Sequence, residues 1–181
     1  FTKSTSTVTY DEAGTQTVDN VDYHHLVISG GNTKTLSSST NVGGDLTVTA
    51  ASTVLAVGSN TIDVNGTTAI TTDGTVTVST GTFDADGTMN CTANFTFTGA
   101  GALNLSNDVT DLGTFTKSTS TVTYDEADAQ TVDDVDYHHL VISGGATKTL
   151  SGSTNVGGDL TVTAASTVLA VGSNTIDVNG T

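Results

Sequence analysis

Acidic side chains are the residues of this chain whose types and spacing could bind a metal ion. The segment Asp84-Ala-Asp86-Gly87 has the spacing that opens many calcium loops, and Asp125, Glu126 and Asp128 form a second acidic group. Calcium takes about six to eight oxygen ligands, which clustered turn aspartates could supply. The glutamate that closes helical calcium loops and the glycine-rich nonapeptide of calcium-binding β-rolls are both absent. Two hypotheses therefore remain: a calcium site at these five residues, or turn aspartates that bond their own backbone.

Histidine and cysteine offer fewer ligands. His24-His25 and His138-His139 each follow a tyrosine and precede an apolar segment. Neighbouring residues of an extended strand point to opposite faces, so we expect neither pair to chelate a metal, and we assign both pairs structural or surface roles. Cys91 is the only cysteine and lies in a β-type stretch, which predicts a buried, inert thiol and excludes an internal disulfide.

The four lysines, Lys3, Lys34, Lys117 and Lys148, are the only cationic side chains other than histidine. They recur in Thr-Lys-Ser and Thr-Lys-Thr contexts. We expect them to be solvated surface charges; pairing with neighbouring acids and covalent crosslinking are the alternatives. Exposed ion pairs contribute little to stability, so neither alternative is needed to hold the fold together.

Composition excludes several functions. The formal net charge is −15, which disfavours nucleic acid and anionic membranes as partners. The sequence has no apolar run long enough to cross a bilayer as a helix, so we expect no membrane insertion. It also lacks the Gly-x-Ser-x-Gly elbow, a phosphate loop and a cysteine–histidine pairing, and we expect no enzyme activity.

An internal repeat dominates the sequence. Residues 1–67 reappear as residues 115–181 with five differences, which are Gly14 to Asp128, Thr15 to Ala129, Asn20 to Asp134, Asn32 to Ala146 and Ser38 to Gly152. We interpret residues 1–114 as one sequence repeat and residues 115–181 as part of a second, within one continuous domain over 1–181. We expect further copies to flank this segment.

A shorter rhythm runs through each repeat, because short strands of alternating apolar residues and threonine recur with small connectors between them. Strands that begin a turn are predicted near positions 7, 26, 46, 69, 95 and 121, so that about five turns make one repeat. The connectors are too short for crossover helices, and no stretch has a helical period. Inward-pointing core residues are then predicted at Leu26, Ile28, Leu46, Val48, Phe95 and Phe97.

This rhythm predicts an all-β fold, a parallel β-helix in which each turn stacks on the preceding one. The alternative is a series of antiparallel β-sandwich repeats, since 114 residues also suit one immunoglobulin-like domain. The regular sub-period and the lack of proline at strand edges favour the β-helix.

Several segments carry a resemblance to known proteins, namely Thr15–Val18, Tyr23–Gly31, Thr33–Leu36, Gly44–Thr49 and Asn60–Gly66. They resemble the tandem units of large bacterial extracellular proteins, similar to autotransporter passengers and filamentous adhesins. The resemblance implies a right-handed β-solenoid at the cell surface or outside the cell, and it brings no catalytic residue.

The leading hypothesis is a non-enzymatic module that forms the shaft of an extracellular filament or adhesin and associates end to end with copies of itself. The alternative is a binding module that uses threonine rows to hold ice or a glycan. Threonine pairs separated by one residue occur at Thr7/Thr9, Thr15/Thr17, Thr33/Thr35, Thr47/Thr49, Thr75/Thr77 and Thr96/Thr98. Because Gln16 and Lys34 lie inside two of these pairs, we expect the pairs to be scattered over different faces.

Overall fold

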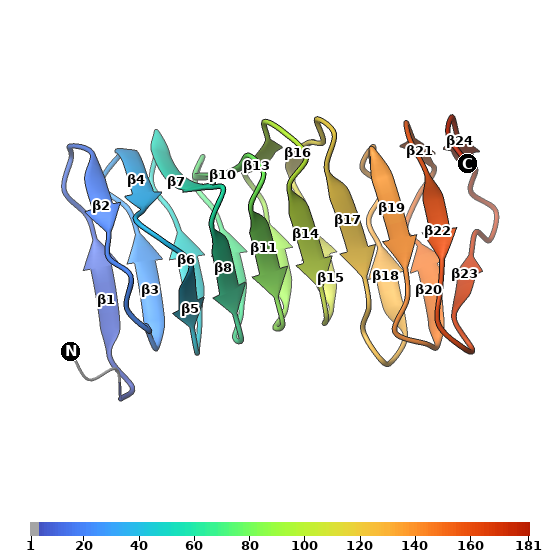
Figure 1. Cartoon of the computed structure of the whole chain (residues 1–181), viewed down its shortest axis with the longest axis horizontal. Helices are drawn as coiled ribbons and strands as arrows, with labels where there is room; N and C mark the ends of the chain where they lie inside the picture. Colours follow the sequence, from blue (N-terminus) through green and yellow to red (C-terminus); the bar gives the residue numbers. More distant parts are fainter. Residues whose placement is uncertain (1–3) are drawn as a thin grey trace.

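The structure, a computed structural model, describes residues 4–181 as a stack of short parallel strands. It is an all-β solenoid of about nine turns, which confirms the predicted β-helix. The sandwich alternative is wrong, because the strand pairings are parallel and link one turn to the next. Figure 1 shows the turns in a single row with the two ends of the chain at opposite ends of the stack.

Each turn contributes to three faces, which we call A, B and C. Face A begins with the sheet β1 (Thr7–Tyr10), β3 (His25–Ile28), β6 (Leu46–Val48), β9 (Thr68–Ile70), β12 (Met89–Cys91) and β15 (Val109–Asp111). Contacts between β15 and β18 continue this face into the sheet β18 (Gln130–Val132), β20 (Thr147–Leu150) and β23 (Val168–Ala170).

Face B begins with the sheet β2 (Gln16–Val18), β4 (Asn32–Leu36), β7 (Thr53–Gly58), β10 (Thr75–Val78), β13 (Asn94–Phe97) and β16 (Thr114–Thr116). The ring of Phe115 in β16 contacts that of Tyr137, whose backbone forms a bridge to Val156. The face therefore continues into β21 (Thr154–Val156) and β24 (Ile176–Val178).

Face C is one unbroken sheet. Its strands are β5 (Thr40–Val42), β8 (Thr61–Val64), β11 (Thr82–Ala85), β14 (Ala102–Leu105), β17 (Thr121–Tyr124), β19 (His139–Ile142) and β22 (Leu160–Val162). No element among residues 4–181 is a helix, so this part of the chain offers no helical membrane span.

Successive turns on face A stack with spacings of 18 to 22 residues, through Val8, Leu26, Leu46, Thr68, Met89 and Val109. The predicted starts near 7, 26, 46 and 69 therefore lie on one face. The predicted starts at 95 and 121 do not, because β13 belongs to face B and β17 to face C. Phe95 stacks on Val76 rather than on the strand at residues 68–70.

The two copies of the repeat consequently occupy different rotational positions. From β1 on face A, five complete turns lead to β15, and two further faces lead to β17, the counterpart of β1, on face C. One repeat is thus five turns and two faces. Equivalent strands of the two copies lie one face apart around the stack.

The core runs along the axis of the stack. All six predicted core residues are buried, which confirms the inward face of the alternating pattern. The aromatic rings of Phe83, Phe95, Phe97 and Phe115 pack together in the middle turns, with ring centroids 5.3 Å apart for Phe83 and Phe95. Burial of such a side chain contributes about 1.5 to 3 kcal/mol.

Tight turns between faces need glycine at a few positions. Gly30 has a φ of +76°, and a Cβ atom there would collide with the carbonyl oxygen of Asp11 in the preceding turn. Its counterpart Gly144 has a φ of +78° and faces Asp125 in the same way. Glycine is required here because the corner packs backbone against backbone.

Candidate functional site

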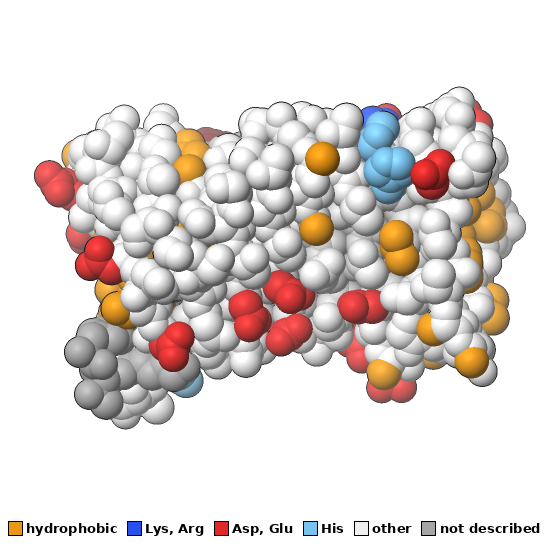
Figure 2. All heavy atoms as spheres, viewed as in Figure 1, with side chains coloured by type: hydrophobic (Ala, Val, Ile, Leu, Met, Phe, Trp, Pro, Cys, Tyr) orange, Lys and Arg blue, Asp and Glu red, His pale blue; other side chains and the backbone are white. Residues whose placement is uncertain are grey.

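Three of the five predicted acidic residues, Asp84, Asp86 and Asp125, lie on face C or at its edge. Asp63 and Asp84 are neighbours in register on β8 and β11, and the row continues to Asn41 at one end and Asn104 at the other. Figure 2 shows carboxylates gathered over the middle of the face that includes these strands. Outward side chains of adjacent parallel strands lie about 4.8 Å apart, so the carboxylates repel one another.

Electrostatics in this group favour protonation. Burial and the carboxylates of Asp86 and Asp63 raise the pKa of Asp84, and the amide of Asn104 opposes the rise. Burial, followed by the charges of Asp63 and Asp125, also raises the pKa of Asp86. Asp63 accepts a hydrogen bond of 3.0 Å at Oδ2 from Asn41, whereas its buried Oδ1 has no hydrogen-bond partner.

The five proposed calcium ligands fall into two groups. Asp84, Asp86 and Asp125 belong to face C or its edge, and Asp125 accepts a hydrogen bond of 2.9 Å from Ser106. The backbone carbonyls of Glu126 and Asp128 instead accept hydrogen bonds from the ammonium group of Lys148. Within residues 4–181, no three His, Cys, Asp or Glu side chains form a group suited to a metal ion.

The buried lysines correct the expectation of solvated charge. Lys34 has 0% exposure, and its Nζ atom donates to the carbonyl oxygens of Glu12, Gly14 and Gly31 at 2.8, 3.0 and 2.5 Å. Lys148 is equally buried and repeats the arrangement with Glu126, Asp128 and Gly145. Each ammonium group joins a turn to the strand stacked on it, which makes these lysines structural.

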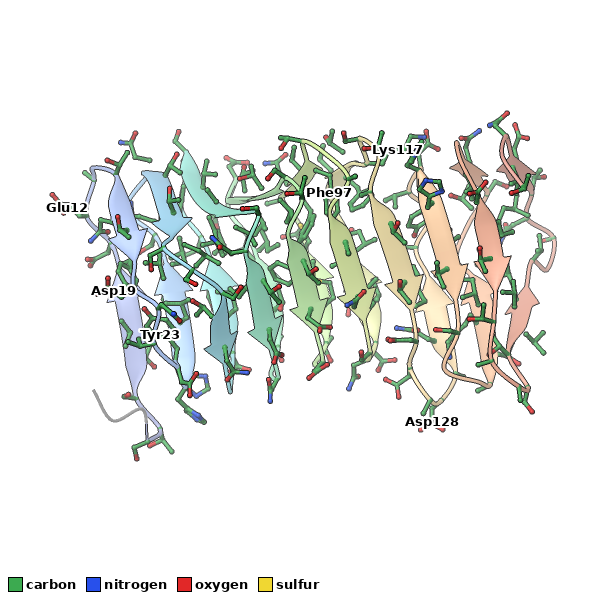
Figure 3. All side chains as sticks on the ribbon, viewed as in Figure 1. Glu12, Asp19, Tyr23, Phe97, Lys117 and Asp128 are labelled. Atoms are coloured by element: carbon green, nitrogen blue, oxygen red, sulfur yellow. The ribbon has the colours of Figure 1, made fainter. Side chains whose placement is uncertain are left out.

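Lys148 and Lys117 differ in environment. Burial lowers the pKa of Lys148, and the charges of Glu126, Asp125 and Asp128 oppose this. Lys117 is partly exposed, and its Nζ atom lies 3.8 Å from the Asp136 carboxylate, so it matches the alternative of pairing with a neighbouring acid. Lys3 lies outside the described residues. Figure 3 shows Lys117 and Asp128 at opposite edges of the stack.

The two histidines of each pair do not point to opposite faces, contrary to the expectation from strand alternation. The rings of His24 and His25 contact each other edge to face with centroids 4.3 Å apart, and those of His138 and His139 lie 4.4 Å apart. Alternation fails here because β3 begins only at His25, so His24 lies at the corner before the strand. The pairs lie on different faces, since β3 belongs to face A and β19 to face C.

A shallow depression of about 280 Å³ on face A is lined by Thr7, His25, Val27, Asp45 and Thr47. His25 Nδ1 accepts a hydrogen bond of 2.9 Å from the backbone N–H of Asp45 and lies 3.3 Å from its carboxylate. The second copy repeats this contact between His139 and Asp159 at 3.0 Å. The Nδ1 lone pairs of His25 and His139 are therefore used in structural hydrogen bonds.

Two tyrosine pairs were not predicted. The hydroxyl groups of Tyr10 and Tyr23 lie 2.8 Å apart, and Tyr23 donates to the carbonyl oxygen of Asp19, whose N–H donates to Tyr10. Figure 3 shows Asp19 and Tyr23 close together at the N-terminal end of the stack. Tyr124, Tyr137 and Asp133 repeat the network. Both pairs lie in turns where an isolated bridge replaces the third strand. The 13-residue spacing of the tyrosines, which recurs in both copies, was the feature of the sequence that could have predicted these pairs.

Cys91 is buried as predicted, and burial raises the pKa of its thiol to about 11. The thiol is therefore protonated at neutral pH, which agrees with an inert core residue.

The six threonine pairs are divided between faces A and B, which agrees with the expected scatter over different faces, although most of them have members on face B. Members of four of the six pairs lie on its strands, namely Thr17, Thr33, Thr35, Thr75, Thr77 and Thr96. Gln16 and Lys34 are the residues that turn inward, so the threonines beside them turn outward. Thr7, Thr9 and Thr47 lie on face A.

No protein family, curated protein or solved structure was found to match this chain.

Proposed function

We propose that this chain is a non-enzymatic module of the shaft of a bacterial extracellular filament or adhesin, in which stacked turns supply length. The observation that carries the proposal is that one 67-residue sequence builds the same turns at two rotational positions. β1 pairs with β3 as Thr7 with His25 on face A, and β17 pairs with β19 as Thr121 with His139 on face C.

The local contacts of the unit are preserved along with this pairing. The bridge from Tyr23 to Val42 recurs from Tyr137 to Val156, and the three-carbonyl contact of Lys34 recurs at Lys148. Each unit thus depends on the turn below and above it rather than on a particular side of the rod. A solenoid with this property can gain or lose copies without redesign of its core.

Charge supports the same role. A net charge of −15 on 181 residues makes long rods repel one another, which keeps them soluble and unbundled. The lysines that could attract an acidic neighbour are few, and Lys34 and Lys148 are buried.

End-to-end stacking is supported by the surface of β22 and β23. Val162 is 47% exposed and Val168 is 51% exposed. The counterpart of Val162 in the first copy is Val48, which is fully buried, whereas the counterpart of Val168 is Val54, an outward residue of β7. We propose that a turn equivalent to residues 68–85 of another copy stacks on this surface.

Chains with increasing numbers of complete 114-residue copies test the shaft function. Five turns and two faces at the usual strand spacing of about 4.8 Å predict about 27 Å of added length per copy. Small-angle X-ray scattering and electron microscopy should show rods that lengthen by this step at constant cross-section. Chains that form separate globules, or that do not lengthen, would contradict the proposal.

Sedimentation of the 181-residue chain tests stacking. Val162→Asp should reduce concentration-dependent self-association, and Thr123→Asp, on the outer side of face C, serves as the matched control. Equal association of both variants and the unmodified chain would contradict end-to-end stacking through β22.

A further inference from the structure

We infer that the part of the outer side of face B formed by the strands β2 to β16 is an ice-binding surface, a function beyond that of the shaft. The surface consists of the outward residues of β2, β4, β7, β10, β13 and β16. One row runs Thr17, Thr35, Ala56, Thr77, Thr96 and Thr116, and the second runs Thr33, Val54, Thr75, Asn94 and Thr114. We call these eleven residues the threonine panel.

The panel is a regular two-dimensional array. Asn94 pairs with Thr75 on one side and with Thr114 on the other, and Thr96 pairs in the same way with Thr77 and Thr116. The two positions within a strand are about 6.6 Å apart, and adjacent strands are about 4.8 Å apart. The one irregularity of register, at Thr77/Val78 against β7, lies at the end of the panel strands.

No charged side chain belongs to the panel. Lys34 lies in β4 yet is fully buried, and Gln16 of β2 also turns inward. The outward rows elsewhere differ in this respect, including face B beyond the panel, where Asp177 of β24 is exposed. Face C carries Asp63, Asp84 and His139, and face A carries His25 and Asp111.

Each threonine presents a methyl and a hydroxyl group at a fixed position. β-branching restricts χ1, and the stacked backbone holds neighbouring side chains in register, so the groups are ordered before binding. Water over the methyl groups cannot hydrogen bond to them, while the hydroxyl groups hold water at regular intervals. Such a surface holds water at regular intervals and lacks the charges that would disrupt its order.

The same residues favour ice over a glycan. Sugar rings stack on exposed aromatic side chains, but the aromatic residues of the panel strands, Phe95, Phe97 and Phe115, are the inward members of their strands. The panel also spans six strands, about 24 Å, as an extended surface. It suits a flat solid more than a short oligosaccharide.

Thermal hysteresis and adsorption of labelled protein to a single ice crystal test the inference. We expect the unmodified chain to adsorb and to arrest ice growth, and Thr77→Lys with Thr96→Lys to lose both effects. Thr123→Lys, which introduces the same side chain on the outer side of face C, should retain them. Circular dichroism establishes that all variants keep the β fold.

Absence of hysteresis and adsorption in the unmodified chain would overturn the inference, as would equal loss in the face C control. Specific binding on a glycan array that the panel variants abolish, without ice adsorption, would also overturn it in favour of a glycan ligand. None of these results alters rod length per copy, so failure here is distinguishable from failure of the shaft proposal.

Discussion

The hydroxyl groups of Tyr124 and Tyr137 lie 2.8 Å apart inside the stack. Tyr137 donates its proton to the carbonyl oxygen of Asp133 at 2.7 Å, so Tyr124 must be the donor within the pair. The N–H of Asp133 donates in turn to Tyr124 at 3.2 Å. The pair thereby holds a turn in which one bridge replaces a strand, and it does so with every hydroxyl proton used.

Removal of one hydroxyl should destabilise this turn. In Tyr137→Phe the carbonyl of Asp133 and the hydroxyl of Tyr124 lose their partner, which predicts a loss of about 1 to 3 kcal/mol in the free energy of unfolding. Tyr23→Phe makes the same change in the more exposed first turn and should cost less. Urea denaturation measures the free energy of unfolding of both variants. Equal losses in the two variants would contradict the prediction that the contribution of the tyrosine pair depends on its burial.

Alkaline pH should act on the same pair. Burial raises the pKa of Tyr124 and Tyr137 above the ordinary tyrosine value. The folded chain then holds these protons more tightly than the unfolded chain, so their contribution to stability falls as pH rises above about 10. Thermal unfolding of Tyr137→Phe across this range should show a weaker pH dependence than that of the unmodified chain.

Loss of the buried ammonium group should be costly. Lys148→Met keeps the aliphatic stem but leaves three carbonyl oxygens without a donor, which predicts a loss of about 2 to 5 kcal/mol. Lys117→Met breaks only a surface pair and should cost roughly 1 kcal/mol or less. Similar unfolding midpoints for the two variants would contradict the structural role of Lys148.

The carboxylates of face C should weaken the fold at neutral pH. Because the pKa of Asp84 is raised above its unfolded value, stability should increase as pH falls from 7 through this pKa toward about 4. Asp84→Asn should raise the melting temperature at pH 7 and reduce this pH dependence. Asp73→Asn, in an exposed turn, is the control, and a lower melting temperature for Asp84→Asn would refute the prediction.

The repeat offers a matched test of burial. Val48→Asp places a carboxylate in the closed core and should lower the free energy of unfolding by more than about 3 kcal/mol. Val162→Asp changes the equivalent residue of the second copy at the exposed end face and should cost far less in dilute solution. Comparable losses under dilute conditions would show that this end face is already covered.

Alternation and repetition in the sequence determined the strands, the parallel stacking and the inward side of those strands in which apolar residues alternate with polar ones. Leu26, Val48 and Phe95 follow directly from it, because an extended chain must place alternate residues on one side. The 62 identities between copies likewise determined that both would make the same local contacts. The burial of Cys91 was also predictable from its place in a β-type stretch.

Only the tertiary structure decided which strand lies on which. Residues 68–114 have no second copy in the chain, so sequence comparison could not locate their corners, and β13 proved to stack on β10 rather than on β9. The same corners determine the length of one repeat, which is five complete turns followed by two further faces. The orientation of Lys34 also depends on carbonyl oxygens 20 or more residues earlier, which become neighbours only when turns stack. Once that lysine turns inward, its two flanking threonines must turn outward. Local sequence determines the alternation of a strand, whereas the contacts between turns decide which of its two sides faces the core.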